Sequence, residues 1–339
     1  MMVEIDAATE FLRARISCDS GDTDFSQYMK FGIQLGYVVP FGLLYFSFLM
    51  AILRRRRHCE VFEDSFFALH AVDGVLTLTF LILDISFIRI NTYVRPICEY
   101  FVPLLKDDSY NLTPYFTIYL YAQFAKMLST LMMSINRYTS VNYPLVHKSM
   151  WIQHCPKAIV AILLIPLLFV WPVAIAKTCF LPNKGQALIM YEHHFRWART
   201  SFGRILIGGS TLIFTIFSSI VTTYKLSKLG KHMRRVEVSL TIATIFMSFG
   251  FALMLIVQVV QLVVPLNTFI DDPWLATFLL GGTQFVNDFY MLSGPVVLLI
   301  LDRKIRKSIL HSSLRRSNSN KRILEVSARP VTITETHMF

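Results

Sequence analysis

Residues 31–57 read FGIQLGYVVPFGLLYFSFLMAILRRRR, a long stretch without charge that ends in four consecutive arginines. A helix of about 20 predominantly apolar residues spans the hydrocarbon core of a bilayer. The stretch is therefore predicted to cross a membrane, with Arg54 to Arg57 held at the headgroups. The whole chain has the same character, because 54% of its residues are hydrophobic and only 16% are charged, against about a quarter in soluble domains.

Seven stretches of the sequence are long and apolar enough to span a bilayer. They predict an all-α membrane protein built as a seven-transmembrane helix bundle. The second and third stretches are less uniform, because they contain charged residues such as Asp73 and Lys126. We keep them as spans, since treating them as loops would leave long apolar runs in water. The predicted spans cover residues 31–53, 66–90, 114–136, 158–176, 204–226, 238–264 and 275–301.

The distribution of basic residues predicts the orientation of the bundle. Most of the 33 lysines and arginines fall in the connections 54–65, 137–157 and 225–237 and in the tail 302–339. Cytoplasmic segments carry such an excess of Lys and Arg. The N-terminal segment 1–30 is therefore expected to be extracellular and the C-terminus cytoplasmic. We assign the net charge of +11 to contact with anionic lipids of the inner leaflet rather than with nucleic acid.

The two ends of the chain differ in character. The N-terminal segment is acidic and lacks the apolar stretch of a cleavable signal peptide. After the last span, LDRKIRKSILHSSLRR combines basic residues with Ile305, Ile309 and Leu310 at helical spacing. This segment is predicted to form a short amphipathic helix along the inner leaflet, followed by a disordered tail.

The cysteines agree with this topology. Cys98 and Cys179 both fall outside, where disulfides form, so we expect a disulfide between them. Cys18 is the alternative partner. Cys59 and Cys155 fall on the cytoplasmic side, where thiols stay reduced.

Charged residues indicate which faces of the predicted helices point inward. Positions eleven apart on a helix differ by about 20°, so Lys126 and Arg137 share one stripe of span three. Asp73 and Asp84 likewise share one stripe of span two. Intramembrane charges face the bundle interior, so both stripes are expected to be buried. Further polar residues are Tyr115, Tyr119 and Gln123 on the stripe of span three, and Gln284, Asn287 and Asp288 in span seven.

Depth along the helices suggests how these charges pair. At about 1.5 Å of rise per residue, Lys126 and Asp288 lie at matching distances from the outer boundary. We expect them to form an ion pair, with Asp73 or Asp84 as alternative partners of the lysine. Such a pair either fixes the register of the helices or forms the floor of a ligand pocket lined by Tyr115, Tyr119, Gln123 and Asp84.

The stretch 135–151, INRYTSVNYPLVHKSMW, places Arg137 at the end of span three, followed by a proline and a tryptophan. Together with AVDGVLTLTFLILDISFIR at 71–89 and LDRKIRK at 301–307, it resembles the nematode serpentine chemoreceptors of the Srg superfamily, of the class gamma and class V type. The resemblance covers essentially the whole chain. It implies a G-protein-coupled chemosensory receptor in the plasma membrane, with a sensory cilium as the more specific location.

The resemblance also implies a ligand site and a site for a cytoplasmic partner. A small molecule would bind between the spans, and a heterotrimeric G protein would dock at the cytoplasmic end. The alternative for Arg137 is that it merely extends to the lipid headgroups. The expected ligand-pocket residues are Asp84, Tyr115, Tyr119, Gln123, Lys126, Gln284 and Asp288. The expected G-protein contacts are Arg137, Tyr138, Pro144, Arg234 and Arg235.

The sequence departs from rhodopsin-like receptors at several points. Asn136 stands where those receptors have the acidic partner of the arginine, and span six has no proline. Cys98 lies too far before Arg137 to cap span three directly. If the resting state is held shut, a residue other than the neighbour of Arg137 must hold it.

A transporter or channel is the competing class of protein. In it Lys126, Asp73, Asp84 and Asp288 would form a proton or ion relay. The lack of internal repeats and of helices broken at Gly or Pro weighs against this class. The sequence contains no HExxH, Walker or GxSxG motif, so we expect no catalytic residues, no metal and no cofactor.

Overall fold

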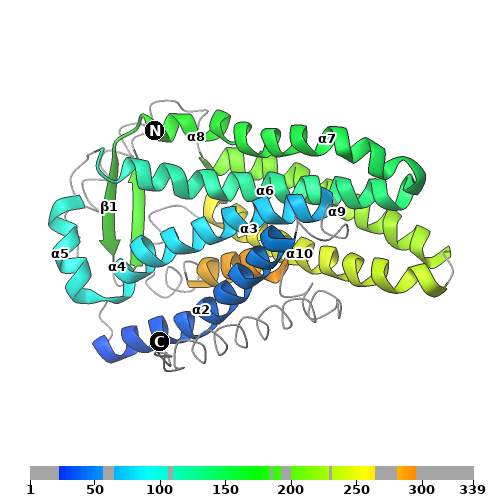
Figure 1. Cartoon of the computed structure of the whole chain (residues 1–339). Helices are drawn as coiled ribbons and strands as arrows, with labels where there is room; N and C mark the ends of the chain where they lie inside the picture. The colour runs from blue at the N-terminus through cyan, green and yellow to red at the C-terminus, as the bar shows by residue number, and fades with distance from the viewer. Residues whose placement is uncertain are drawn as a thin grey trace, which may run out of the picture.

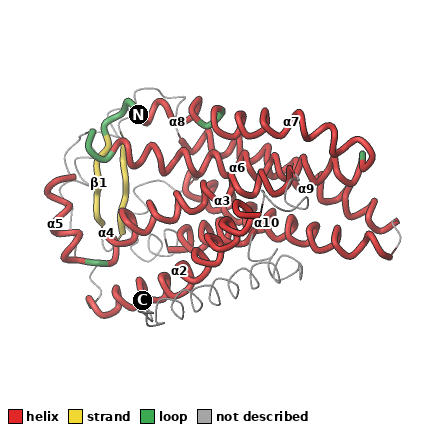
Figure 2. The backbone as a smooth tube through the Cα atoms, in the orientation of Figure 1, coloured by secondary structure: helices red, strands yellow, loops and turns green. Residues whose placement is uncertain are grey.

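The computed structural model describes residues 23–55, 65–105, 110–183, 186–191, 200–228, 231–263 and 281–294. Its elements are α2 (Asp24–Arg55), α3 (Ser65–Leu83), the π-helix η2 (Asp84–Arg89), α4 (Ile90–Tyr93), α5 (Arg95–Leu105), α6 (Thr113–Asn142), α7 (Pro144–Leu164), α8 (Leu167–Ala174), β1 (Thr178–Asn183), β2 (Gln186–Tyr191), α9 (Thr200–Lys228), α10 (Lys231–Val263) and the helical residues 281–294. Long helices lie side by side and form a bundle (Figures 1 and 2). The antiparallel pair β1–β2 lies at the end of the bundle where α4 and α5 are found (Figure 1).

Within the described residues each predicted span coincides with helical residues, although several helices extend beyond the predicted limits. The predicted connection 137–157, for example, is largely helical, because α6 continues to Asn142 and α7 begins at Pro144. The predicted helical bundle is therefore confirmed, whereas crossing of the bilayer by all seven stretches stays a prediction. Among the described residues, four helices are long and apolar enough to cross a membrane: Asp24–Leu53, Ser65–Tyr93, Pro144–Ala174 and Gly203–Lys225.

Helix α6 is less apolar than these four helices, which fits its position inside the bundle. It packs against α3, α7, α8 and α9, and its residues 122–130 are all buried. The side chains of a helix enclosed by protein meet neighbouring helices rather than lipid. Polar and charged residues are therefore tolerated in α6 where those neighbours can satisfy them.

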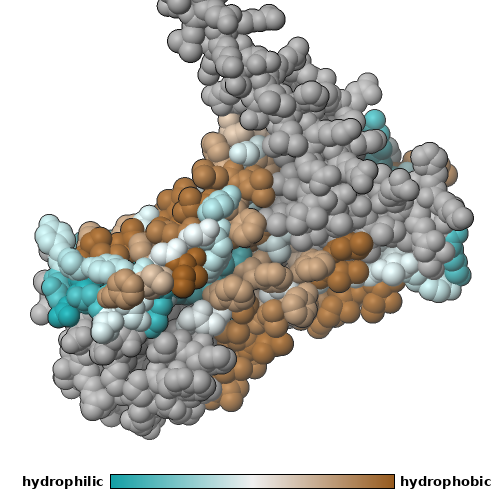
Figure 3. Space-filling model, turned by 90° about the horizontal axis from the view of Figure 1, so that it is seen from below, coloured by the Kyte–Doolittle hydropathy of each residue, from teal (hydrophilic) through white to brown (hydrophobic). Residues whose placement is uncertain are grey.

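The outer surface of the bundle is apolar. Large hydrophobic side chains remain exposed along the peripheral helices, among them Ile82, Leu168 and Ile213. In Figure 3 hydrophobic residues gather over the middle of the visible face, while hydrophilic residues lie toward its two ends. An exposed apolar belt of this kind is expected for a surface that faces lipid.

Two of the predicted spans are irregular. Span two changes from α-helix to the π-helix η2 and then continues as α4. Span four is divided into α7 and α8 by a turn at Ile165 and Pro166, since proline cannot continue the helical hydrogen-bond ladder. The expectation that no helix is broken was therefore wrong, and it no longer argues against a transporter.

The hairpin β1–β2 is not expected from the helical pattern, so the all-α prediction holds for the bundle but not for this segment. The two strands pair from Thr178 opposite Tyr191 to Asn183 opposite Gln186. Thr113 Oγ1, at the start of α6, donates a hydrogen bond of 2.8 Å to the carbonyl of Ala176. The same Oγ1 lies 3.2 Å from the Oγ1 of Thr178, the first residue of β1, and this contact ties the hairpin to the central helix.

Of the two cysteines in the predicted disulfide, only Cys98 has a described side chain. Cys98, in α5, is buried and disulfide-bonded, and α5 packs against β1, the strand that contains Cys179. The side chain of Cys179 and the whole of Cys18 lie outside the described residues, so the pairing stays a prediction. Cys155 is a buried free thiol, as predicted.

Several other predictions also fall outside the described residues. These are the segment 1–22, both ends of span seven (275–280 and 295–301) and the tail 302–339 with its amphipathic helix. The last residues of the predicted extracellular segment are described, and they already belong to α2, which begins at Asp24.

Candidate functional site

A buried guanidinium lies at the centre of one polar cluster in the bundle. Arg89 Nε donates a hydrogen bond of 2.5 Å to Asp84 Oδ2, and Arg89 Nη2 donates to Asp288 Oδ1. All three side chains are buried, so two carboxylates share one cation away from water. We call this group the Arg89 cluster; its members are Gln34, Tyr37, Asp84, Arg89, Tyr93, Gln284 and Asp288.

The π-helix η2 explains how Arg89 reaches Asp84. Residues five apart in an α-helix lie about 140° apart around the axis, because each residue turns the helix by about 100°. A π-helix has more residues per turn, which brings positions i and i+5 toward the same side. Asp84 and Arg89 are the first and last residues of η2. The widened turn therefore directs both charges into the bundle.

Neutral side chains complete the Arg89 cluster. The hydroxyl of Tyr37 donates to Asp288 Oδ2 at 2.6 Å. Gln34 Nε2 donates to the hydroxyl of Tyr93 at 2.9 Å and to Gln284 Oε1 at 3.1 Å, and the Tyr93 hydroxyl donates to Gln284 Oε1 at 2.8 Å. The cluster thus joins the first, second and seventh predicted spans through hydrogen bonds that keep its buried polar groups satisfied.

Lys126 lies in a second polar cluster. Its Nζ is 2.5 Å from Asp73 Oδ2, which also accepts a hydrogen bond of 2.6 Å from the hydroxyl of Tyr45. The ammonium lies 6.0 Å from the ring centroid of Tyr45 and 5.8 Å from that of Tyr290, within cation–π range. We call this group the Lys126 cluster; its members are Tyr45, Asp73, Lys126, Thr130 and Tyr290, whose hydroxyl is 3.0 Å from Thr130 Oγ1.

The predicted ion pair between Lys126 and Asp288 is wrong. Lys126 pairs with Asp73, one of the two alternative partners, and Asp288 pairs with Arg89. Matching depth does not determine which helices face each other, and α3 packs directly against α6. Arg89 meets Asp288 because a planar guanidinium with five donors can serve two carboxylates at once.

Polar contacts follow the interface between α3 and α6 along its length. In this antiparallel pair, residues later in α6 meet residues earlier in α3, so the predicted inward stripes of both helices are confirmed. At one end the Tyr115 hydroxyl donates a hydrogen bond of 2.9 Å to the carbonyl of Leu83, and the Tyr119 hydroxyl donates one of 3.4 Å to Asp84 Oδ1. In the middle Lys126 Nζ donates to Asp73 Oδ2 at 2.5 Å. At the other end Asn136 Nδ2 donates to Ser65 Oγ at 2.7 Å.

Arg137 lies at the far end of this interface and is buried in the bundle. Only 7% of the residue is exposed, and its guanidinium carbon is 4.9 Å from the ring centroid of Phe66. The alternative expectation, that this side chain merely extends to the lipid headgroups, does not fit its burial. Arg137 is therefore part of the packed interior, at the end of α6 opposite to Tyr115.

Two of the other predicted G-protein contacts, Tyr138 and Pro144, also lie at this end of α6. Tyr138 is half-buried beside the ring of Phe217, and Pro144 is exposed at the start of α7. Arg234 and Arg235 belong to α10, but their side chains lie outside the described residues. The structure thus brings Arg137, Tyr138 and Pro144 to one end of the bundle.

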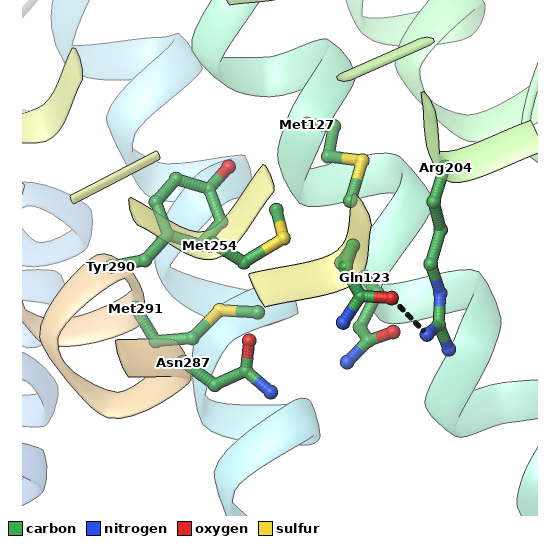
Figure 4. A pocket seen from close by; sticks show the side chains of 8 residues that line it. Gln123, Met127, Arg204, Met254, Asn287, Tyr290 and Met291 are labelled. Atoms are coloured by element: carbon green, nitrogen blue, oxygen red, sulfur yellow. Dashed lines mark hydrogen bonds between the residues drawn. The ribbon is translucent and has the colours of Figure 1, made fainter. Parts of the chain in front are cut away.

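A small cavity lies between α6, α9, α10 and the helical residues 281–294 (Figure 4). Its empty space is about 240 Å³ when the opening to solvent is included, but the enclosed part has room for only about one water molecule, so it is far smaller than a typical ligand site. Of the predicted ligand-pocket residues only Gln123 lines it, since the others belong to the two clusters or to the α3–α6 interface. The lining residues are Gln123, Met127, Arg204, Met254, Gln258, Asn287, Tyr290 and Met291.

Several residues of the two clusters were not among the predicted site residues. Arg89 could have been found, because a charge in an apolar span is a functional signal by itself. Tyr45, Gln34, Tyr37 and Tyr93 carry no charge, and nothing in their spacing singled them out. Their role depends on which helices meet, which only the fold shows.

The fold and these clusters define a class: a helical membrane protein in which the buried carboxylates of Asp73, Asp84 and Asp288 are paired with buried cations inside the bundle. Among the described residues there is no group of three or more His, Cys, Asp or Glu side chains that could hold a metal ion. Buried charges in a membrane bundle mark functional positions by default, because they are costly to place there.

The chain belongs to the Srg family of chemoreceptors, whose family model matches residues 31–309. It is similar to serpentine receptor class gamma-5 of Caenorhabditis elegans, with 28% identity over 295 residues, or 86% of this chain and 89% of the relative. It is also similar to serpentine receptor class gamma-11 of the same organism, with 24% identity over 311 residues, or 91% and 90%. The predicted resemblance is confirmed, and the family is one of receptors rather than of enzymes.

Proposed function

We propose that this protein is a chemosensory receptor with seven membrane spans, which binds a small molecule and activates a heterotrimeric G protein. Its N-terminus would be extracellular and its C-terminus cytoplasmic, in the plasma membrane and more specifically that of a sensory cilium. Membership of the Srg family supports the chemosensory role. The proposed coupling between ligand binding and G-protein activation is supported by the polar interface between α3 and α6. This interface runs from the Tyr115 end of the bundle to Arg137.

The ligand would act near the Arg89 cluster. A molecule that widens the cavity beside Gln123 as it binds would contact Asn287, which directly precedes Asp288 in the chain. A shift of the seventh predicted span would then change the bonds of Asp288 to Arg89 and Tyr37. Ligand binding shifts a conformational equilibrium only through such differential contacts. The proposed pocket residues remain Asp84, Tyr115, Tyr119, Gln123, Lys126, Gln284 and Asp288.

The G protein would dock at the Arg137 end. The start of α7 presents an exposed apolar segment there, with Leu145 98% exposed and Tyr143 and Val146 more than half exposed. Exposed apolar groups beside basic ones suit a protein partner at the cytoplasmic surface. Lys225 and Lys228, exposed near the end of α9, would contact anionic lipids of the inner leaflet.

An Arg137→Ala receptor is expected to reach the cell surface but to lose G-protein activation by about tenfold or more, the effect of removing a charged hydrogen-bonding partner. The measurement is a small-molecule screen in cells that report G-protein activation, with surface-labelled receptor used to normalise the response. Normal activation by the variant at wild-type surface level would contradict the role of Arg137.

A transporter or channel stays the second candidate, favoured by the irregular second and fourth spans. For a relay, a proton or ion would have to pass between Lys126, Asp73, Asp84 and Asp288. In the part of the chain that the structure describes, these residues belong to two separate clusters, each with its own cation. That separation supports the receptor over the relay.

A further inference from the structure

The acidic partner that rhodopsin-like receptors place next to their arginine is replaced here by Asn136. The structure gives Asn136 a different role, since its Nδ2 donates a hydrogen bond of 2.7 Å to Ser65 Oγ in the first turn of α3. The next residue, Arg137, lies with its guanidinium carbon 4.9 Å from the ring centroid of Phe66, the next residue of α3. Two consecutive residues of α6 thus hold two consecutive residues of α3.

The ring of Phe66 is itself held in place from the next turn of α3. His70 is 1% exposed and packs edge-to-face on Phe66, with ring centroids 4.3 Å apart and an interplanar angle of 77°. His70 also meets Phe48 of α2, with ring centroids 6.4 Å apart. One turn further along α3, Asp73 pairs with Lys126. The face of Phe66 is therefore fixed by packing that continues to the Lys126 cluster.

We propose that Phe66 is a positioning residue for Arg137: its ring holds the guanidinium inside the bundle in the resting state, and G-protein activation requires the guanidinium to leave that ring. A cation within about 6 Å of a ring centroid is attracted by the ring quadrupole, more strongly where water is excluded. Arg137 meets both conditions, because it is buried and lies within that distance. The activation step rests on the proposed receptor function, whereas the positioning step does not.

The positioning step is tested by a double-mutant cycle on thermal stability of the purified full-length protein. Phe66→Leu keeps an apolar side chain but removes the ring face, and Arg137→Gln removes the cation. The two changes are expected to be coupled, so that the double variant unfolds at a higher temperature than the sum of the single shifts predicts. Additive shifts would contradict the contact. Arg137→Gln combined with Phe169→Leu, which removes a half-buried ring packed on Phe124 elsewhere in the bundle, is the control and should be additive.

The activation step is tested by basal G-protein signalling at matched surface levels. Phe66→Leu should raise basal signalling roughly two- to thirtyfold, the range expected for loss of one cation–π contact that favours the resting state. Phe66→Trp, which keeps an aromatic face, should stay near the wild-type level, and so should Phe169→Leu. An effect of Phe66→Trp as large as that of Phe66→Leu, or no rise with Phe66→Leu, would overturn the proposal.

The two assays separate this inference from the proposed function. If neither wild type nor any variant activates a G protein with any compound, the proposed function fails while the stability cycle still decides whether Phe66 positions Arg137. If the wild type responds to a compound but Phe66→Leu does not raise basal signalling, the proposed function stands and the activation step fails.

Discussion

An Arg89→Met receptor is expected not to reach the cell surface. Removal of one partner of a buried ion pair costs about 3–5 kcal/mol, and here Asp84 and Asp288 lose the same cation while both stay buried. The loss approaches the total stability of many folded domains, which is about 5–15 kcal/mol. Surface labelling measured against total receptor in the same cells gives the result directly.

An exposed arginine provides the matched control for Arg89. Arg95 forms an ion pair of 2.8 Å with Glu99 on the surface of α5, and both side chains are about half exposed. Arg95→Met should therefore cost less than about 1 kcal/mol and leave surface expression unchanged. Adding Asp84→Asn and Asp288→Asn to Arg89→Met should restore part of the surface expression, because no carboxylate is then left without its cation. Wild-type surface levels of Arg89→Met alone would show that the Arg89 cluster does not hold the bundle together.

A Lys126→Met receptor is expected to be destabilised by about 3–5 kcal/mol as well, because Asp73 is left as an uncompensated buried carboxylate. Tyr45 still donates to Asp73 Oδ2, but a neutral donor does not replace the ammonium. The measurements are surface expression and the thermal unfolding midpoint of the purified protein. Lys148→Met, which removes an exposed lysine of α7, is the control and should behave as wild type.

Rescue of the Lys126 variant separates a structural role from a ligand role. Lys126→Met combined with Asp73→Leu replaces the ion pair by apolar side chains of similar size, a change that is often neutral or stabilising. The double variant should return to the surface, and failure to do so would contradict a simple structural pair. A surface-competent double variant that responds normally to ligand would remove Lys126 from the proposed pocket.

The sequence alone was sufficient to predict the helices and their inward faces. Long apolar stretches can be satisfied only as helices in lipid, and charges such as Lys126 and Asp73 had to face the interior for the same reason. Both side chains are buried as predicted. These properties depend on local composition and on the fixed geometry of the α-helix, so a single sequence contains them.

The partners of these charges could not be predicted from the sequence. Lys126 had three carboxylates in reach, and the choice of Asp73 depends on the packing of α3 against α6. The π-helix that turns Arg89 inward departs from the regular α-helix that was predicted for span two. Likewise Asn136 and Phe66 are unremarkable in sequence, and their contacts arise only when the first turn of α3 meets the end of α6.

The central claim is that ligand binding is transmitted through the bundle to a G protein, and that the buried charges are not an ion pathway. The most direct test measures ligand-evoked responses of the wild-type receptor in reporter cells with and without their G proteins, together with membrane current and ligand uptake. The account predicts a response that is lost when the G proteins are removed, with no receptor-dependent current or uptake. A current or an uptake that persists without any G protein would contradict the account and favour the transporter or channel.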